Sequence, residues 1–313
     1  MMSRDQLHRQ NTGNAVVLIP AYNASATISE TLEALQTNPG LYRIRAVIVL
    51  DDASRDGTID VAKLAWRSSV SLEIWSNETN LGERATTNSG IARLPVDIEW
   101  AFILHADDVV NSNWISLYLD EMSGCPDDIA TICSSYDNWY PASGQIVSGE
   151  EYPDRPSVLV RGTRDTVVDT LNRGCWWHLS GCAIRTMAFR QIGGFKVDMP
   201  QTGDWEWLLR CLAKGYSVRY LPRSTMRYRQ HSTSVSSNSF REARDIKEQF
   251  RIFTLYRDQG YFSAVDFGKK IRSMLIQLLR RTLIRAMRCD FIGMRYHAVL
   301  LCEIGTRFAL KRI

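Results

Sequence analysis

The strongest indication of fold class lies in residues 44–58, Ile44-Arg-Ala-Val-Ile-Val-Leu50-Asp51-Asp52-Ala-Ser-Arg-Asp-Gly-Thr58. The apolar, β-branched run does not alternate with polar residues, as expected of a strand that is buried on both faces. It ends in two adjacent aspartates, and the Ser, Asp and Gly that follow favour a turn and the start of a helix. The stretch therefore predicts a buried strand, a polar turn and a helix.

The same succession recurs on both sides of this stretch. Further unalternating runs predict buried strands at residues 15–20, 72–75 and 101–105. Amphipathic patterns predict helices between the strands at residues 25–36, 58–67 and 83–93. Alternating strands and helices with short connections predict an α/β fold with a mostly parallel central sheet. Ligands of such sheets bind at the carboxyl ends of the strands.

The pattern loosens after residue 108. Residues 134–164, with their Tyr, Pro, Gly and Ser, predict a long excursion over the surface. A helix is predicted at residues 204–212 and a strand at residues 218–221, because the apolar positions return there with regular spacing.

A change of charge marks the end of the chain. Residues 241–313 hold 16 Lys and Arg against 7 Asp and Glu, so the net charge of +4 divides into −5 before residue 241 and +9 after it. The Ser-rich run 232–239 predicts a hinge in front of this tail. We therefore predict one domain over residues 1–236 and a basic helical C-terminal region over residues 237–313.

Cysteine usage and the N-terminus bear on the compartment. The seven cysteines are odd in number and form no Cys-x-x-Cys pair, which favours reduced thiols over a zinc ribbon or a disulfide framework. The start of the chain is polar, and no window reaches about 18 uninterrupted apolar residues. We expect a cytoplasmic protein with neither an export signal nor a membrane span.

Acidic and polar groups stand at four places where predicted strands end or a helix begins, residues 20–23, 51–58, 105–108 and 203–206. Because the carboxyl ends of parallel strands lie along one edge of a sheet, these groups should converge. Asp51 and Asp52 have two interpretations, a helix-capping turn or acceptors for a nucleobase or a ribose hydroxyl.

The other three candidates also leave alternatives open. Asp107 and Asp108 can be a solvated turn or the hard ligands of a divalent cation that a diphosphate completes. Asp204 can serve the dipole of its helix or act as a general base. His231 can be a structural residue or a ligand of metal or phosphate.

Several function classes lack their sequence motifs. The chain has no G-x-x-x-x-G-K-[ST], no G-x-G-x-x-G after the first strand and no G-x-S-x-G, which argues against P-loop enzymes, dinucleotide oxidoreductases and hydrolases of that type. Few aromatic residues interleave with the basic residues of the tail, and we expect no nucleic-acid partner.

Six segments occur in order between residues 14 and 236: Val16-Val-Leu-Ile-Pro20-Ala-Tyr22-Asn23, Asp51-Asp-Ala-Ser-Arg-Asp-Gly-Thr58, Asn80-Leu-Gly-Glu-Arg-Ala-Thr-Thr-Asn88-Ser-Gly90, His105-Ala-Asp-Asp108, Gly193-Gly-Phe195 and Gly203-Asp-Trp-Glu-Trp-Leu-Leu-Arg210. Together they resemble the family 2 glycosyltransferases, which have the GT-A fold. The resemblance implies an inverting, metal-dependent, hexosyltransferase-like enzyme that moves a sugar from a UDP-, GDP- or dTDP-linked donor to an acceptor hydroxyl, with Mn²⁺ or Mg²⁺ as cofactor.

On the donor side, the resemblance implies that Pro20, Tyr22 and Asp51 line the nucleoside pocket, with Asp52 beside it. The acidic residue that often follows Tyr-Asn is Ala24 here, and the arginine that often precedes the asparagine of the third segment is Thr87. Arg84 is our candidate for supplying a charge near that position.

At the reacting centre, the family's D-x-D segment falls on His105-Ala-Asp107. The resemblance implies that Asp107 contacts the metal and the diphosphate, that His105 replaces the first acid, that Asp204 is the catalytic base and that His231 lies near the metal or the diphosphate. The mechanism implied is a single displacement that inverts the anomeric carbon.

The acceptor is expected against residues 175–181 and the 134–164 excursion. Trp176 and Trp177 can stack on sugar faces, or one of them can belong to the core. In the tail, Ile271, Met274, Leu275, Leu278 and Leu279 share one helical face, so we predict either packing on the catalytic domain or peripheral contact with an anionic membrane, where a lipid-linked acceptor for bacterial cell-surface polysaccharide or glycoconjugate synthesis would lie.

Two other functions remain open at this point. A non-catalytic scaffold subunit that binds nucleotide sugars would retain the fold without turnover, and the His105 substitution favours it. A nucleotidyltransferase would need a Gly-rich phosphate loop with Lys or Arg after the first strand, which residues 20–25 lack.

Overall fold

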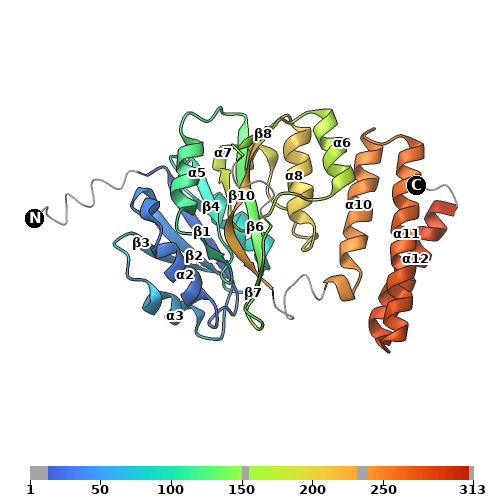
Figure 1. Cartoon of the computed structure of the whole chain (residues 1–313), viewed down its shortest axis with the longest axis horizontal. Helices are drawn as coiled ribbons and strands as arrows, with labels where there is room; N and C mark the ends of the chain where they lie inside the picture. Colours follow the sequence, from blue (N-terminus) through green and yellow to red (C-terminus); the bar gives the residue numbers. More distant parts are fainter. Residues whose placement is uncertain (1–12, 150–154, 231–238, 310–313) are drawn as a thin grey trace, which may run out of the picture.

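A mixed β-sheet forms the centre of the molecule (Figure 1). The computed structural model describes residues 13–149, 155–230 and 239–309. Along the sheet the strands follow the order β3 (Ser71–Ser76), β2 (Ala46–Asp51), β1 (Ala15–Ala21), β4 (Trp100–Ile103), β9 (Cys182–Arg185), β6 (Ile129–Tyr140), β10 (Ser217–Arg229) and β5 (Val109–Val110). Two short strands lie off this path, β7 (Gln145–Val147) on β6 and β8 (Val158–Val160) on β10.

Most strands of the main path point the same way. β3, β2, β1 and β4 are parallel, and so are β6 and β10. β9 lies between β4 and β6 and is antiparallel to both, and β5 is antiparallel to β10. The α/β class with a mostly parallel central sheet is therefore confirmed. Two strands run against the others, β9 inside the sheet and β5 at its end.

Helices cover both faces of the sheet. One face packs against α2 (Ile28–Gln36), the 3-10 helix η1 (Pro39–Arg43), α3 (Thr58–Ala65) and α5 (Trp114–Met122), and the other against α4 (Glu83–Arg93), α6 (Arg164–Arg173), α7 (Thr186–Ile192) and α8 (Gly203–Ala213). Successive side chains of β1 alternate between the two cores, as the period of two in a strand requires. This double burial explains the unalternating apolar runs of β1, β2 and β4. The prediction of a buried strand at residues 72–75 was wrong, because β3 lies at the edge of the sheet and its residues are exposed or half-buried.

The sheet is followed by α10 (Arg244–Asp258), α11 (Ala264–Met287) and α12 (Phe291–Ala309), which lie beyond α6 and α8 in Figure 1. Their apolar side chains belong to the same core cluster as α8. Ile271, Met274 and Leu278 are buried in that cluster, so this part of the predicted face is not available to a membrane, whereas Leu279, predicted on the same face, is exposed. None of the helices in the described ranges is long and apolar enough to cross a bilayer.

The 134–164 excursion was the least accurate prediction of secondary structure. β6 continues to Tyr140, and β10 extends from the predicted 218–221 to residue 229, because the two strands pair in parallel with irregularities over this whole length. Residues 232–238 of the predicted hinge and the predicted boundary at 236/237 lie outside the described residues.

Candidate functional site

The two aspartates that close β2 are both buried, and they are used differently. The carboxylate of Asp52 accepts hydrogen bonds from the backbone N–H groups of Leu81 and Gly82 and from the side chain of Asn77, each at 2.8 Å. Burial raises the pKa of Asp52, but these hydrogen bonds outweigh it and lower the pKa below its usual value. Asp52 thus holds the loop that leads into α4. Asp51 pairs in register with Ala21, where β1 and β2 reach their carboxyl ends.

The loops after β1 and β2 are linked to each other. Asn23 has a left-handed backbone with φ of 48°, and its side chain accepts the Arg55 N–H at 2.9 Å. Asp56 accepts the Ser25 N–H at 3.0 Å, and hydrogen bonds from Thr58 and Ser25 overcome burial to lower the pKa of Asp56 to about 2. These contacts leave the Tyr22 side chain half-exposed beside the carboxyl end of β1, after the buried Pro20.

A charged cluster stands at the carboxyl end of β4. One ligand atom from each of His105, Asp107 and Asp108 lies within 4.8 Å of the others. Burial lowers the pKa of His105, but the charge of Glu83, whose oxygen lies 3.5 Å from Nε2, raises it to about 9. Burial and the negative charge of Asp107 raise the pKa of Asp108 to about 7. At neutral pH His105 is therefore a half-buried cation beside two carboxyl groups.

The donor set fits a divalent cation through Asp107 and Asp108. Two crowded carboxyl groups supply the hard oxygen ligands that Mg²⁺ and Mn²⁺ prefer, and a bound cation would offset the burial and the Asp107 charge that raise the pKa of Asp108. A protonated His105 cannot donate a lone pair to a metal, but it can pair with a phosphate oxygen. His231, the other predicted ligand, lies outside the described residues.

Alternating charges connect this cluster to Asp204. Glu83, at the start of α4, contacts both His105 and the Arg84 guanidinium, the latter at 2.9 Å. Arg84 is buried and its Nη2 lies 3.8 Å from Asp204 Oδ1. Burial lowers the pKa of Arg84, but the charges of Glu83 and Asp204 raise it on balance. The structure therefore brings together four predicted site residues, namely Arg84, His105, Asp107 and Asp204.

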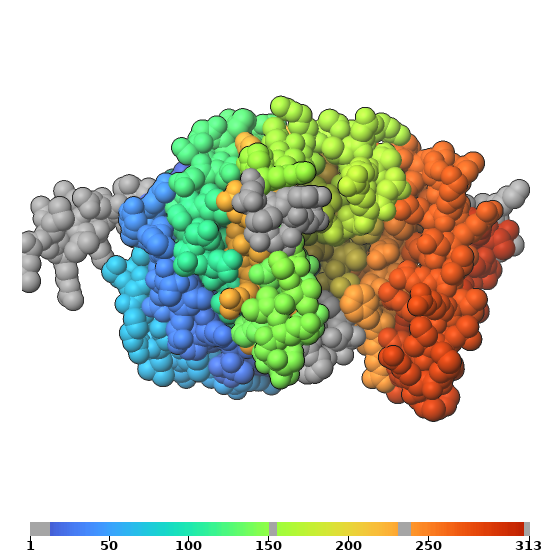
Figure 2. All heavy atoms as spheres, in the orientation of Figure 1, coloured from blue at the N-terminus to red at the C-terminus, as the bar shows by residue number. Residues whose placement is uncertain are grey.

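A cleft of about 870 Å³ opens beside Asp204. Trp176, His178 and Tyr220 line it on the side of the sheet, and Phe253 and Lys270 of the C-terminal helices also line it. In Figure 2 the surface is recessed between the green segments and the orange helices.

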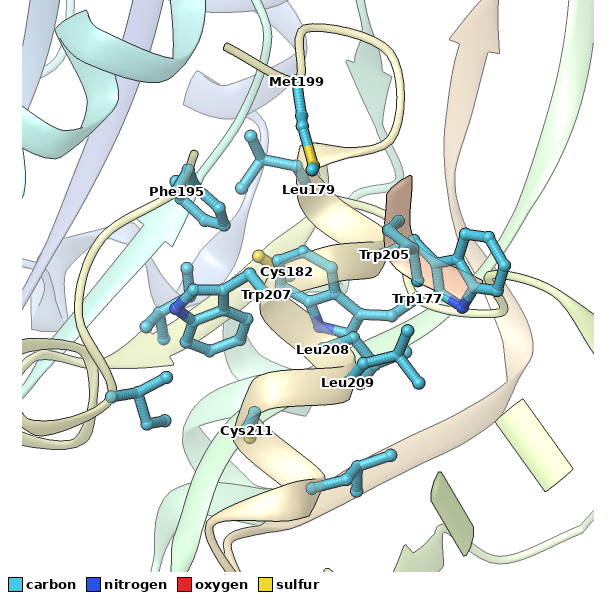
Figure 3. Close-up of a cluster of buried hydrophobic side chains, with 14 of the residues drawn as sticks. Trp177, Leu179, Cys182, Phe195, Met199, Trp205, Trp207, Leu208, Leu209 and Cys211 are labelled. Carbon is cyan, nitrogen blue, oxygen red and sulfur yellow. The ribbon is translucent and has the colours of Figure 1, made fainter. Parts of the chain in front are cut away.

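The two adjacent tryptophans divide between cleft and core. Trp177 is 2% exposed, packs against Trp207 and donates its indole N–H to Thr131, and Figure 3 shows it within the apolar cluster. Trp176 is half-buried in the wall of the cleft, and its indole N–H bonds Thr170. Trp177 also borders the cleft, but Trp176 is the more exposed of the two and is better placed to contact a ligand.

Two of the six sequence segments are explained by internal contacts. Arg210 forms an ion pair with Glu206 and donates to the carbonyl groups of Ile192, Gly193 and Gly194. These contacts, together with paired hydrogen bonds between Asn88 and the Phe195 backbone, link α8 and α4 to the Gly-Gly-Phe turn. The turn and α8 are thereby positioned next to the site.

Sequence reasoning missed Glu83, Ser180 and Glu248. The Ser180 hydroxyl accepts the His105 backbone N–H at 3.0 Å. Glu83 could have been identified as an acid next to Arg84 within the third segment, but an acid in the first turn of a helix is also common for electrostatic reasons. Nothing local in the sequence pointed to Glu248.

Comparison with known families places the chain. The model described as Glycosyl transferase family 2 matches residues 16–179, which is more than half of the chain. The protein belongs to this family. A second model, Glycosyl transferase family group 2, matches residues 100–297 of this glycosyltransferase family member and so reaches into the C-terminal helices.

Its relatives are distant. The chain is 25% identical to the glycosyltransferase AglE of Haloferax volcanii over 206 residues, which cover 65% of this chain and 63%, less than two thirds, of AglE. It is 24% identical over 228 residues to the UDP-Glc:alpha-D-GlcNAc-diphosphoundecaprenol beta-1,3-glucosyltransferase WfaP of Escherichia coli, covering 72% of this chain and 81% of WfaP. The crystal structure of S. aureus TarS 1-349 in complex with UDP-GlcNAc has a TM-score of 0.57 at 16% identity, covering 85% of this chain and 66% of that chain. This likeness confirms the GT-A fold.

Proposed function

We propose that the protein is an inverting glycosyltransferase that transfers a sugar from a nucleotide-sugar donor to an acceptor hydroxyl. The strongest support is the series of contacts from His105 through Glu83 and Arg84 to Asp204. These contacts connect a candidate base beside a large cleft to the charged cluster at the end of β4, whose groups suit a metal-bound diphosphate. The donor is a UDP-, GDP- or dTDP-linked sugar; the related TarS structures contain UDP or UDP-GlcNAc.

On the donor side, Pro20, Tyr22 and Asp51 bind the nucleoside, and Asp52 supports them by holding the neighbouring loop. Asp107, with Asp108 beside it, holds a divalent cation, Mn²⁺ or Mg²⁺. When bound there, the cation would supply positive charge next to the diphosphate leaving group. His105 adds a positive charge on the same side, which can pair with a phosphate oxygen of the donor. This contact compensates for the acid that the family pattern has at the same position.

On the acceptor side, Asp204 acts as the general base. The acceptor oxygen attacks C1 of the donor sugar, its proton passes to the Asp204 carboxylate, and the bond from C1 to the diphosphate oxygen breaks with inversion. The Arg84 guanidinium, with Nη2 3.8 Å from Asp204 Oδ1, helps to hold the carboxylate in place. The cleft beside Asp204 receives the acceptor sugar, and Trp176 contacts its apolar face.

The acceptor we propose is a lipid-linked glycan of bacterial cell-surface polysaccharide or glycoconjugate synthesis. WfaP acts, by its description, on a diphosphoundecaprenol-linked GlcNAc. The division that we propose, a GT-A domain over residues 1–236 and a helical region over residues 237–313, assigns the contact with the lipid surface to the second part.

Exposed residues of α11 and α12 support this peripheral contact. They are apolar residues and arginines, namely Ile276, Leu279, Leu283, Met287, Phe291, Ile292 and Val299 with Arg272, Arg280, Arg288 and Arg295. Apolar side chains flanked by cations favour the surface of an anionic bilayer.

Vesicle sedimentation tests the membrane contact. We expect the protein to bind vesicles that contain anionic lipid more strongly than neutral ones, and Leu283→Glu/Met287→Glu to abolish this preference. Val96→Glu is the matched control, because Val96 is equally apolar and exposed but lies outside the C-terminal helices. Unchanged sedimentation of the double variant would remove the peripheral contact from the proposal.

Calorimetry tests the donor site. UDP, GDP and dTDP are titrated with and without Mn²⁺ into the wild type, Asp107→Ala and Asp204→Asn. We expect metal-dependent binding of one nucleotide that is lost in Asp107→Ala and retained in Asp204→Asn, while turnover is lost in both. Nucleotide binding without turnover in the wild type would favour the scaffold function, and no binding at all would overturn the donor site.

A further inference from the structure

The loop in front of α8 is held by a residue from the C-terminal helices. Glu248 on α10 is 5% exposed, and its Oε2 accepts hydrogen bonds from the backbone N–H groups of Gln201 at 3.1 Å and Thr202 at 2.7 Å and from the Thr202 hydroxyl at 3.0 Å. Three donors thus converge on one carboxylate oxygen. Gln201 and Thr202 come three and two positions before Asp204, so their placement determines where α8 begins.

The same contacts take the place of the side-chain hydrogen bond that usually caps the N-terminus of a helix. Thr202 is the N-cap residue of α8, yet its side chain makes no capping bond to the helix and donates to Glu248 instead. A negative charge at this end also complements the partial positive charge of the helix N-terminus. The first turn of α8, which contains Asp204, is therefore oriented through α10 rather than by its own cap.

A second set of contacts supports the same loop. Arg251, about one turn further along α10, forms an ion pair with the Asp198 carboxylate and donates to the Asp198 carbonyl oxygen at 3.1 Å. On the far side of the loop, Trp205 packs edge-on against Phe253 with ring centroids 5.7 Å apart. α10 therefore touches the segment before, at and after the N-terminus of α8.

We propose that Glu248 is a positioning residue for transfer: it holds residues 201 and 202 so that the Asp204 carboxylate is presented to the acceptor cleft. The inference rests on the proposed role of Asp204. Glu248 does not line the cleft, whereas Asp204 does, so Glu248 acts through the loop and not on the acceptor. The C-terminal helical region then contributes to the chemical step as well as to acceptor binding.

The test compares Glu248→Ala, Glu248→Asp and Glu248→Gln. Glutamine offers a carbonyl oxygen of the same reach, aspartate is shorter by one methylene, and alanine accepts no hydrogen bond. Turnover is followed as release of nucleoside diphosphate from the UDP-, GDP- or dTDP-sugar whose nucleotide binds in calorimetry, with water as acceptor. Displacing a catalytic group by about 1 Å costs roughly 100-fold in rate, so we expect kcat to fall about 10- to 100-fold in Glu248→Ala and Glu248→Asp and to recover in Glu248→Gln.

Nucleotide affinity separates this role from general damage. We expect Kd for the nucleotide to stay within about twofold of wild type in all three variants, because an interaction felt only in the transition state changes kcat. Arg251→Ala is the matched control: it removes a contact with the same loop that is more exposed and further from Asp204, and we expect a smaller loss of kcat.

Two further measurements keep the inference separate from the proposed function. Hydrogen exchange at the amides of Gln201 and Thr202 must speed up in Glu248→Ala; unchanged exchange would overturn the positioning role whatever Asp204 does. In an Asp204→Asn background Glu248→Ala should cause no further loss, and an equal fold-loss in both backgrounds would show a merely structural role. If Asp204→Asn alone retained wild-type turnover, the role of Asp204 as the base would be refuted. The exchange of the Gln201 and Thr202 amides would still show whether Glu248 holds the loop.

Discussion

Replacing Asp52 by asparagine should destabilise the protein, although Asp52 stands in a segment associated with the donor nucleotide. Asparagine keeps one carbonyl oxygen, which can accept from Leu81 and Asn77, but its amide N–H₂ then faces the Gly82 N–H. The change leaves one buried donor without an acceptor and removes the charge from the other two hydrogen bonds. A buried unsatisfied group costs about 1–3 kcal/mol and a charged hydrogen bond contributes about 1.5–3 kcal/mol, so we expect a loss of about 2–4 kcal/mol in the free energy of unfolding.

The loss should depend on pH in a defined direction. The pKa of Asp52 is lower in the folded protein than its usual value, since the hydrogen bonds outweigh burial. The stabilisation is therefore fully present above the unfolded value of about 3.9 and is lost as pH falls through the folded pKa. The gap between wild type and Asp52→Asn should be largest near neutral pH and shrink in strong acid.

Urea unfolding at a series of pH values measures this gap. Asp51→Asn is the control, because Asp51 is equally buried but accepts one long hydrogen bond, from the Ser54 N–H at 3.3 Å. We expect Asp51→Asn to cost less than about 1 kcal/mol of stability and to weaken nucleotide binding. If Asp52→Asn unfolded within about 0.5 kcal/mol of wild type, or if Asp51→Asn were equally destabilising, the assignment of Asp52 to the support of the loop would be refuted.

Three further outcomes follow from the geometry. Asp204→Asn should lower kcat by roughly 10²- to 10⁴-fold, the usual contribution of a general base, with an unchanged melting temperature; transfer at the wild-type rate would exclude the base. Trp177→Ala should cost about 3–5 kcal/mol by opening a cavity, whereas Trp176→Ala should raise KM for the acceptor with little loss of stability; equal melting temperatures would contradict this division. Arg281→Ala should destabilise by about 3 kcal/mol because it strips the partner from the buried Asp245, 2.7 Å away, and Arg281→Ala/Asp245→Asn should recover part of that loss in thermal unfolding.

The sheet could be predicted where burial is uniform along a strand. β1, β2 and β4 are buried on both faces, so their sequences are continuous apolar runs. β6 and β10 are different, because their outer halves are partly exposed and contain polar and aromatic side chains without a clear period. Their extension depends on pairing between residues about 90 positions apart, which no local pattern reports.

The site could be predicted as far as residue type and strand ends allow. The proximity of Arg84 and His105 follows from the carboxyl edge of the parallel strands, whereas Asp204 lies on α8, which comes after the antiparallel β9 and α7. The role of each group does not follow from that edge. Two adjacent aspartates suggested a ligand or a donor, and for Asp52 the donors come from a loop about 30 positions further along the chain. The charge state of His105 likewise depends on Glu83, a neighbour in space only.

The tail shows the limit of periodicity. The spacing of Ile271, Met274 and Leu278 identified an amphipathic helix, but a helical period does not specify what covers the apolar face. In the structure that face is covered by the core, and a second, outward-facing set of apolar residues such as Ile276 and Met287 lies on the other side of α11.

Glu248 follows Thr202 by 46 residues, which gives the order of synthesis a functional meaning. A ribosome completes the donor-binding strands, the charge cluster and Asp204 itself well before α10 emerges. A nascent chain at that stage has every residue proposed for the donor site among the described segments, while the loop before α8 still lacks its acceptor of hydrogen bonds. The residues proposed for donor binding are therefore made before α10, whereas transfer also depends on Glu248, which is made later.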